Sequence, residues 1–385
     1  MKQTRREFLR GAVGWGGLLL AGSLELAMTR GAEPLRRARH FLARQQSADG
    51  AWRSGRYAAF RGGDALTPVI LWAMQTGSRE SGSSFQKAGG QDTFARGLRW
   101  LCQLTDLLRD RAEPWTTLSY PLFTASYSAQ VFARCGDSGR AGTWVNVIRS
   151  LRTGEELGWP ADNPMCGAWS DASRPPQYVS PVPDMLAPNI SATALAVSAL
   201  AAAGCSESAA RPFIERCQNF AEENPTPFDD GGFFFALDDP IRNKAGSAGR
   251  DRHGTERFRS YGSATCDGWL ALRALGWSTA HPRLRAAAAW LQNHFAGLDL
   301  AGDWPGSRAE ARASLAFYQA QALAGVLVDL PADDDWSHAF RKTLVDTLLA
   351  RQGDDGSWQG LAPDSCEDEP LLASAFTMRA LSLLG

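Results

Sequence analysis

The sequence predicts an all-α fold, an α/α toroid in which six outer helices surround six inner helices. Two observations lead to this prediction. Amphipathic and almost wholly apolar segments alternate along the chain, and a short turn with an aromatic residue follows each amphipathic segment. One helix pair cannot bury its own apolar face, so repeated pairs stack until the array is capped or closes on itself. Six pairs closed into a ring meet this condition, with the apolar helices inside.

The predicted elements alternate, an outer helix and then an inner one. Pro34 suits the first turn of the first outer helix, and the first inner segment, 64–76, is nearly all apolar. The predicted outer helices are Pro34–Gln46, Asp92–Arg109, Thr143–Thr153, Ala209–Glu223, Pro282–Phe295 and Trp336–Gln352. The predicted inner helices are Asp64–Thr76, Ser119–Arg134, Asn189–Ala203, Tyr261–Leu275, Ala311–Leu330 and Pro370–Leu384.

The first and last turns carry the same motif. Phe41–Trp52 and Leu348–Trp358 each have a Gln four residues after an apolar anchor (Phe41/Gln45 and Leu348/Gln352), then an acidic-Gly turn and Gly-x-Trp. Gly permits the positive φ that ends a helix, and the indole is expected to fold back under the helix end. The aromatic residues of the six turns are Trp52, Trp115, Trp169, Phe233, Trp304 and Trp358.

These two turns resemble the QW repeat of the squalene cyclases, whose wider relatives include the β subunits of the protein prenyltransferases. The resemblance covers about residues 34–385 and implies an α/α toroid, in agreement with the periodicity. Squalene cyclases carry two such barrels, with the proton donor in one of them. This chain has room for one barrel, so we expect a single toroid domain at residues 33–385.

The N-terminus matches a twin-arginine export signal, Thr4-Arg5-Arg6-Glu7-Phe8-Leu9, followed by the Gly-rich stretch Gly11–Met28. Five Gly and Glu25 make this stretch a poor transmembrane helix. We assign residues 1–32 to the signal segment and predict export by the twin-arginine route to the periplasm or another extracytoplasmic space. An uncleaved signal would tether the protein to the membrane. A chance pair of arginines on a cytoplasmic protein is the alternative.

Composition excludes several classes of partner. A net charge of −1 and a pI of about 6.5 give no reason to expect a nucleic acid. The seven cysteines form no C-x-x-C pair and only five His are present, so we expect neither a zinc site nor another metal or cofactor. The fourteen Trp are expected to pack at the repeat ends, with stacking on a lipid or carbohydrate as the alternative. The expected partner is a small molecule or a lipid.

Functional residues are expected where the inner helices begin. If inner and outer helices alternate in direction, all inner N-termini reach one end of the ring, together with the positive ends of their dipoles. The candidate catalytic residues there are Asp64, Asp267, Glu367, Asp368 and Glu369. The candidate ligand-binding residues are Asn189, Ser191, Tyr261, Cys266, Trp269 and Tyr318.

The segment from Asn189 departs from the cyclase pattern. In squalene cyclases the comparable helix begins Asp-x-Asp-Asp-Thr-Ala, and the middle Asp protonates an alkene or epoxide. Here Thr193-Ala194 match, but the acidic positions read Asn189, Ser191 and Ala192. An amide or a hydroxyl cannot protonate an alkene, which requires a strong carboxylic acid. Helix N-capping is the structural alternative for Asn189 and Ser191.

The zinc pattern of the prenyltransferases is also incomplete. Their β subunits hold zinc through an Asp, a nearby Cys and a later His on inner helices. Cys266-Asp267 stand in the reverse order, and the two inner helices that follow contain no His. The resemblance therefore does not extend to zinc, and Cys266 is interpreted as a small buried residue.

The acidic run Glu367-Asp368-Glu369 precedes the last inner helix, whose dipole it suits. The functional alternative pairs one of these acids with Asp64, because ring closure makes the first and sixth inner helices neighbours. Such a pair could act on a sugar or bind Ca²⁺. The long loops Asp171–Pro188 and Phe228–Ser260 also precede inner helices and are either lids or plain connectors.

We therefore expect an exported cyclase-like repeat protein that lacks the cyclase reaction and binds a ligand or partner at the toroid. One alternative is an isoprenoid enzyme that uses another acid, such as Asp64, Asp267 or Glu369, beside an apolar pocket. The residues expected to form that pocket are Trp72, Phe123, Trp269, Phe317 and Phe376. A second alternative is a periplasmic carbohydrate hydrolase or lyase, which requires two carboxylates about 5–9.5 Å apart.

Overall fold

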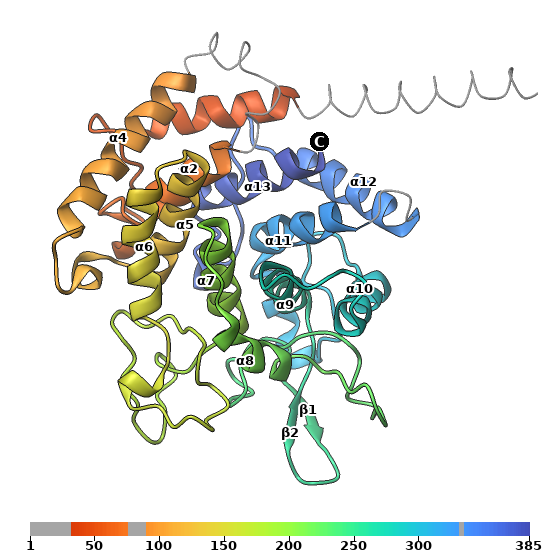
Figure 1. The fold of residues 1–385 in the computed structure, drawn as a ribbon. Helices are drawn as coiled ribbons and strands as arrows, with labels where there is room; N and C mark the ends of the chain where they lie inside the picture. The colour runs from red at the N-terminus through yellow and green to blue at the C-terminus, as the bar shows by residue number, and fades with distance from the viewer. Residues whose placement is uncertain (1–31, 76–89, 331–334) are drawn as a thin grey trace, which may run out of the picture.

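The inner ring consists of apolar helices that contact one another in sequence and close into a circle (Figure 1). The computed structural model describes residues 32–75, 90–330 and 335–385. Within these ranges each inner helix contacts the next, and the last contacts the first. These helices are α2 (Leu66–Met74), α5 (Pro121–Arg134), α7 (Ile190–Ala202), α9 (Gly262–Ala274), α11 (Ala316–Asp329) and α13 (Pro370–Leu384). The ring confirms the predicted α/α toroid.

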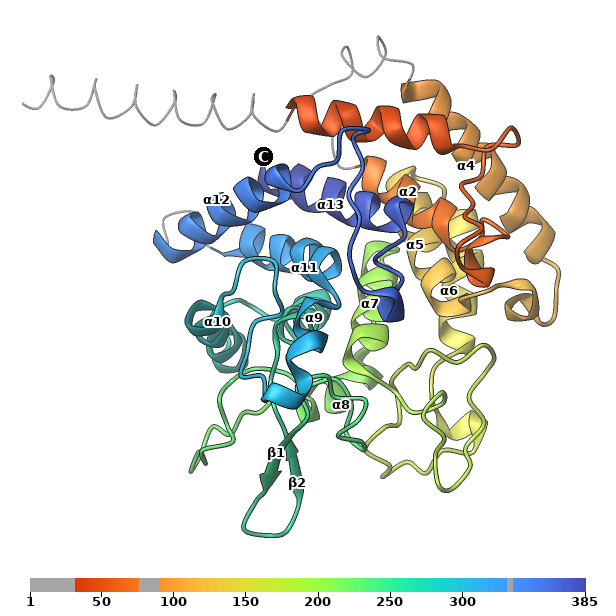
Figure 2. The same cartoon turned by 180° about the vertical axis from the view of Figure 1, so that it is seen from behind.

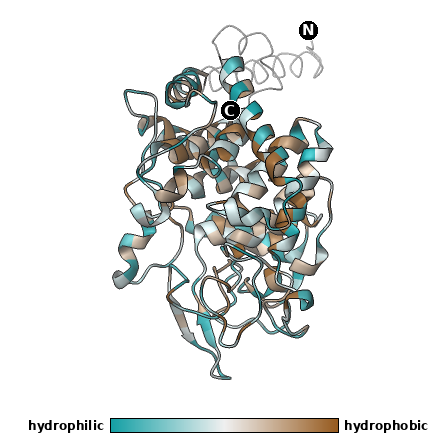
Figure 3. Cartoon of the chain, turned by 90° about the vertical axis from the view of Figure 1, so that its left-hand side faces the viewer, coloured by the Kyte–Doolittle hydropathy of each residue, from teal (hydrophilic) through white to brown (hydrophobic). Residues whose placement is uncertain are grey.

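The outer helices lie against the ring and bury one face each. In α10 the buried residues are Leu284, Ala287, Trp290 and Leu291, which recur at the spacing of one helix face. In α2, by contrast, every residue from Leu66 to Met74 is buried. The outer helices are residues 32–45, α4 (Gly90–Leu108), α6 (Ser138–Ser150), α8 (Arg211–Arg216), α10 (Pro282–His294) and α12 (Asp335–Ala350). The hydrophobic residues accordingly concentrate in the packed helices (Figure 3).

The Gly-x-Trp turns fold as the sequence predicts. The indole Nε1 of Trp52 donates to the carbonyl of Leu42, and that of Trp358 donates to the carbonyl of Leu348, so both rings lie under the helix end. Gly50 and Gly356 have φ of 101° and 91°, which L side chains rarely adopt.

The prediction for the first glutamine was wrong by one residue. Gln45 is exposed, whereas the side chain of Gln46 donates to the carbonyls of Gly50 and Thr93. Gln352 makes the equivalent bonds to Gly356 and Pro34. Each glutamine therefore joins its own turn to the next outer helix around the ring, and Gln352 joins the last repeat to the first.

A second repeated contact ties the turns to the inner helices. The backbone N–H of four of the six turn aromatics donates to a hydroxyl on an inner helix. The four pairs are Trp52–Thr67, Trp169–Thr193, Phe233–Thr265 and Trp358–Ser374, at 2.9 to 3.2 Å. Thr193, the residue that matches the cyclase pattern, therefore has a structural role common to four repeats.

Some predicted elements differ from the structure. The outer helix expected at 209–223 is only α8, because the chain turns after Arg216 and Gln218 pairs with Phe233. The expected loop 228–260 contains an antiparallel hairpin, β1 (Ser247–Arg250) and β2 (Glu256–Phe258), which projects from the helices (Figures 1 and 2). The last-but-one inner helix also begins later than predicted, after a 3-10 segment, Gly306–Ala313.

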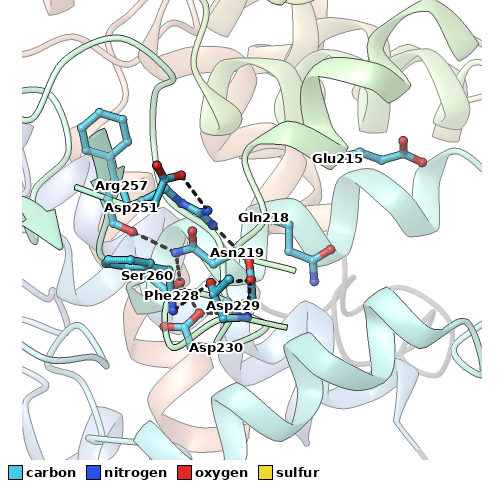
Figure 4. Close-up of polar contacts among 12 residues, drawn as sticks. Glu215, Gln218, Asn219, Phe228, Asp229, Asp230, Asp251, Arg257 and Ser260 are labelled. Carbon is cyan, nitrogen blue, oxygen red and sulfur yellow. Dashed lines mark hydrogen bonds and ion pairs between the residues drawn. The ribbon is translucent and has the colours of Figure 1, made fainter. Parts of the chain in front are cut away.

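Polar contacts fasten the base of that hairpin to the segment that follows α8 (Figure 4). The amide of Asn219 donates to Ser260 Oγ and to the carbonyl of Phe258. Ser260 in turn donates to Asp230 at 2.7 Å, and Arg257 pairs with Asp229 at 3.0 Å. This loop is therefore anchored on both sides of the hairpin, immediately before α9.

The predicted export signal lies outside the described residues. Among the helices of the described ranges, none is both long and apolar enough to cross a bilayer.

Candidate functional site

The starts of the inner helices gather at one end of the ring, here called the N-terminal end. Side-chain and backbone contacts join the segments that lead into neighbouring helices. Asp64, before α2, accepts from the N–H of Ser119, before α5, at 2.7 Å. Likewise, the N–H of Gly262 at the start of α9 donates to the carbonyl of Ala301, before α11, at 2.9 Å. This arrangement brings the inner-helix starts together, as the alternation of helices implied.

Three of the candidate residues meet at this end. Asp267 on α9 is 3% exposed, and its two carboxylate oxygens accept hydrogen bonds from two neighbouring helices. Ser191 Oγ on α7 donates to Oδ2 at 2.5 Å, and the hydroxyl of Tyr318 on α11 donates to Oδ1 at 2.9 Å. Ser191 and Tyr318 are half-buried, so neither residue is fully sealed from solvent. We call Ser191, Asp267 and Tyr318 the Asp267 triad.

Burial dominates the acid–base properties of the triad. Desolvation raises the pKa of Asp267 to about 7, although the hydrogen bonds from Ser191 and Tyr318 lower it. Burial and the charge of Asp267 also raise the pKa of Tyr318 well above its usual range. Near neutral pH the carboxyl therefore exchanges a proton, while the phenol stays protonated and can donate a hydrogen bond.

Aromatic rings adjoin the triad. Tyr318 packs edge-on against Phe376, with ring centroids 5.6 Å apart. On the neighbouring helices, Tyr127 contacts both Phe123 and Trp72, with centroids 4.7 and 4.9 Å away. Asp267 is close enough to Tyr127 to raise the pKa of that phenol, after the larger effect of burial. The site thus combines one polar group of side chains, the Asp267 triad, with aromatic side chains packed around it.

Asn189 has the capping role that the sequence offered as its structural alternative. Its Oδ1 accepts from the N–H of Ala192 at 2.8 Å, at the start of α7. Its amide nitrogen donates to Asp171 at 2.9 Å, which ties the preceding loop to the helix. Ser191, two residues further, faces Asp267 instead.

The acidic run before α13 holds the ring together. Glu367 is 1% exposed and accepts the backbone N–H groups of Phe317 and Tyr318, so it caps the neighbouring helix α11. Burial raises the pKa of Glu367 to about 7, against the lowering effect of these N–H groups. Glu369 caps its own helix through the N–H of Leu371.

Asp64 and the acidic run are held by different partners. Asp368 pairs with Arg56 at 2.6 Å and accepts a hydrogen bond from Tyr57, while Glu369 accepts one from Ser54. Within the described part of the chain, no hydrogen bond joins Asp64 to these acids. The helices α2 and α13 are neighbours, as ring closure required, but segment 54–57 makes the contact.

The remaining candidates are packed inside the protein. Tyr261, Cys266 and Trp269 are each 1% exposed or less. Burial, followed by the charge of Asp267, raises the pKa of Cys266 well above its usual range, which keeps it a neutral thiol. Among the described residues, no cluster of three metal-ligating side chains occurs.

Two residues of this region were not anticipated from the sequence. Burial raises the pKa of Tyr127, the charge of Asp267 raises it further, and the charge of Arg379 lowers it. Arg379 lies over the ring of Trp72, 4.5 Å from its centroid. Both lie on segments predicted as inner helices, but an isolated Tyr or Arg in an apolar helix gave no sign of its neighbours.

Solved structures identify the fold. The chain superposes on the type II terpene cyclase MstE from Scytonema with a TM-score of 0.58 at 15% identity, over 92% of this chain and 97% of that one. The fold is that of the terpenoid-cyclase-like toroids. The GH76A alpha-1,6-mannanase from Salegentibacter sp. HEL1_6 shares it, with a TM-score of 0.55 at 12% identity, over 92% of this chain and 100% of that one. No protein-family model and no characterised protein sequence matches the chain.

These comparisons locate this toroid within a fold shared by different chemistries. One of the similar chains acts on a terpenoid and another on a mannan, by their names. The fold alone therefore does not select between a terpenoid and a sugar ligand. The side chains at the N-terminal end of the ring decide which ligand suits this chain.

Proposed function

We propose that this chain is an exported toroid protein that binds a mainly apolar molecule through a hydroxyl or similar group at the N-terminal end of its ring. The observation that carries the proposal is the convergence of Ser191, Asp267 and Tyr318 from three neighbouring inner helices. The exposed parts of Ser191 and Tyr318 can exchange hydrogen bonds with a ligand, and Asp267 orients both hydroxyls. The export part rests on the arginine pair at residues 5 and 6.

The aromatic surroundings favour an isoprenoid-like ligand over a sugar. Phe123, Tyr127 and Phe376 surround the triad with aromatic rings, and Phe123, the half-buried one of the three, would lie against a hydrocarbon chain that ends in a hydroxyl. MstE has been solved with geranylgeranyl dihydroxybenzoate, and an inactive GH76A variant with alpha-1,6-mannotriose. Retaining or inverting sugar hydrolysis needs two facing carboxylates, and Asp64 and Glu367 are each engaged by backbone N–H groups of neighbouring segments.

We infer further that the triad does not start a cyclisation. Protonating an alkene requires a strong acid, and the raised pKa makes Asp267 a weaker acid than an ordinary carboxyl. Both of its oxygens are also engaged by hydroxyls. The position of the middle acid in the cyclase pattern is Ser191, which has no acidic proton to give.

Two measurements on the full chain test this proposal. Isothermal titration calorimetry with farnesol and geranylgeraniol should show binding, and Asp267→Ala should weaken it about tenfold, the equivalent of about 1.4 kcal/mol. Asp106→Asn, at an exposed ion pair with Arg140, is the matched control and should leave binding unchanged. After incubation with squalene or geranylgeraniol, chromatography should recover each compound unchanged. A cyclic product, or the absence of binding for both alcohols, would overturn the proposal.

A general acid–base enzyme acting on the same kind of ligand is the second candidate. The specific observation in its favour is the pKa of about 7 for Asp267, because proton transfer is most efficient when the pKa lies near the working pH. Turnover of geranylgeraniol to a non-cyclic product, with a rate that changes around pH 7 and is lost in Asp267→Asn, would select this candidate.

A further inference from the structure

A cavity of about 320 Å³ lies on the outer side of the ring, lined by residues of α9, α10 and α12, the turn before α10 and the end of α11. Small-molecule sites in proteins have volumes of this order. The small side chains of Ala288 and Ala289 on α10 leave the space open, and Leu330 and Trp336 supply apolar surface beside it. The cavity therefore has room and apolar contact area for a compact organic molecule.

Trp269 brings a buried hydrogen-bond donor to this cavity. The residue borders the cavity and is 0% exposed, and its indole Nε1 makes no hydrogen bond within the described residues. By contrast, the seven other tryptophans that the described part of the chain buries all donate a hydrogen bond from Nε1. A buried indole normally has a partner, because an unpaired buried N–H is costly. The N–H of Trp269 thus lacks the acceptor that a ligand could supply.

This donor is separate from the Asp267 triad. Two residues along an α-helix turn by about 200°, so Asp267 and Trp269 occupy opposite faces of α9. Asp267 contacts Ser191 and Tyr318 of the neighbouring inner helices, whereas Trp269 borders the cavity beside α10. The cavity therefore does not depend on ligand binding at the triad.

Three more polar side chains line the cavity and have no partner. Arg285 and Gln292 are exposed on α10, seven residues apart and so on one face of that helix, and Thr279 precedes it. Within the described residues, no hydrogen bond or ion pair engages these three side chains. None of the described lining residues is acidic. Several donors around a single positive charge are complementary to a carboxylate, which accepts hydrogen bonds on both oxygens.

We propose that this cavity binds a small organic carboxylate with an apolar body. The carboxylate pairs with Arg285 and accepts the indole N–H of Trp269, and Gln292 and Thr279 provide further donors. The apolar body packs against Leu330 and the half-buried ring of Trp336. Recognition requires both parts of the ligand, because the cavity offers one cationic group beside apolar surface.

Calorimetry at pH 7 with three probes tests the site in the full chain. 4-Phenylbutyrate carries a carboxylate and an apolar body, 4-phenylbutyramide has the same body without the charge, and acetate has the charge without the body. 4-Phenylbutyrate should bind at least about tenfold more tightly than either of the others, and added NaCl should weaken its binding. Equal affinities for 4-phenylbutyrate and its amide, or no binding of 4-phenylbutyrate at millimolar concentration, would overturn the proposal.

Substitutions locate the bound probe. Arg285→Gln should weaken 4-phenylbutyrate binding about tenfold, and Trp269→Phe, which keeps an aromatic ring but removes the N–H, should weaken it severalfold. Arg351→Gln, at an exposed position on the surface, is the matched control for the lost charge and should have no effect. If Trp269→Phe does not fold, Arg285→Gln, at an exposed residue, decides the test. Wild-type affinity in Arg285→Gln would overturn the proposal.

The indole N–H gives a second readout. In a nitrogen–proton NMR spectrum of protein with labelled tryptophan, the indole signal that is absent from Trp269→Phe belongs to Trp269. 4-Phenylbutyrate should shift this signal in the wild type, because the N–H gains an acceptor, and the same concentration should shift it less in Arg285→Gln. If the probe binds and the signal does not move, the carboxylate lies elsewhere and the assignment is wrong.

Discussion

Ser191 donates a 2.5 Å hydrogen bond to Asp267, which lies on the next inner helix of the ring. In the pattern that α7 resembles, the position of Ser191 carries the middle acid. In α7 none of the acidic positions of that pattern carries an acid. The carboxyl of Asp267, from α9, lies against Ser191 instead. A buried acid therefore lies at this position of the ring, but it comes from the neighbouring helix and has different chemical surroundings.

The stability of the protein should depend on the ionisation of Asp267. Its pKa in the folded protein, about 7, is above the ordinary value of 3.8, so the folded state binds the proton more tightly than the unfolded state. The contribution of this group to stability is then fully present below about pH 4 and is lost as pH rises toward 7, by about 3 to 4 kcal/mol. Urea unfolding between pH 5 and pH 8 measures this fall.

Asp267→Asn isolates the contribution of this carboxyl. The variant should gain stability relative to the wild type at pH 8, and the gain should shrink toward pH 5. Some pH dependence will remain, because the pKa of Glu367 is raised in the same direction. An unchanged difference between the two proteins at every pH would show that Asp267 does not titrate in this range.

Two adjacent glutamines give a sharp test of the link between the first and second repeats. Gln46→Ala removes hydrogen bonds to Gly50 and Thr93 and should destabilise the protein by about 1 to 3 kcal/mol. Gln45→Ala alters an exposed side chain and should change the free energy of unfolding by less than about 0.5 kcal/mol. Chemical denaturation of the two variants measures both values. Equal effects would mean that Gln46 has no special role.

The turn glycine at position 50 is required by both conformation and space. A Cβ there would lie 2.5 Å from the carbonyl oxygen of Arg96, and φ is 101°. Gly136 also has positive φ, 74°, but nothing lies within 4 Å of its Cβ position. Gly50→Ala should therefore unfold at a temperature several degrees lower than Gly136→Ala, which carries the backbone strain alone. Similar melting temperatures would remove the steric argument.

The glutamine and glycine positions show how far the sequence specifies this fold. Apolar periodicity located every inner helix, because burial on all sides leaves few polar residues in a segment. Periodicity could not show that the outer helix at Arg211 stops after Arg216, since that depends on the pairing of Gln218 with Phe233. It also could not choose between Gln45 and Gln46, which differ only in the face of the helix end that they occupy.

The candidate site was predicted less completely. Ser191, Asp267 and Tyr318 were each singled out because they stand near inner-helix starts, but nothing in the sequence indicated that they meet. Their contact depends on the order of helices around the ring and on the depth of each residue in its helix. The role of Glu367 could not be read from the sequence either, because this residue caps α11 rather than the helix that it precedes.

Export should depend on the arginine pair. A fusion of residues 1–32 to a reporter that is active only after folded export should reach the periplasm of a bacterium with a twin-arginine system. Replacing both arginines, Arg5→Lys with Arg6→Lys, should abolish that export. The matched control changes Arg10→Lys, outside the pair, and should be exported normally. Cytoplasmic retention of the unchanged fusion would contradict the assignment.

The position of a bound alcohol tests the central claim most directly. A crystal structure with geranylgeraniol should show the hydroxyl within hydrogen-bond distance of Ser191 or Tyr318, and the chain against Phe123. A ligand bound outside the ring, in the groove of about 1190 Å³ beside α6, with the Asp267 triad unchanged, would contradict the account.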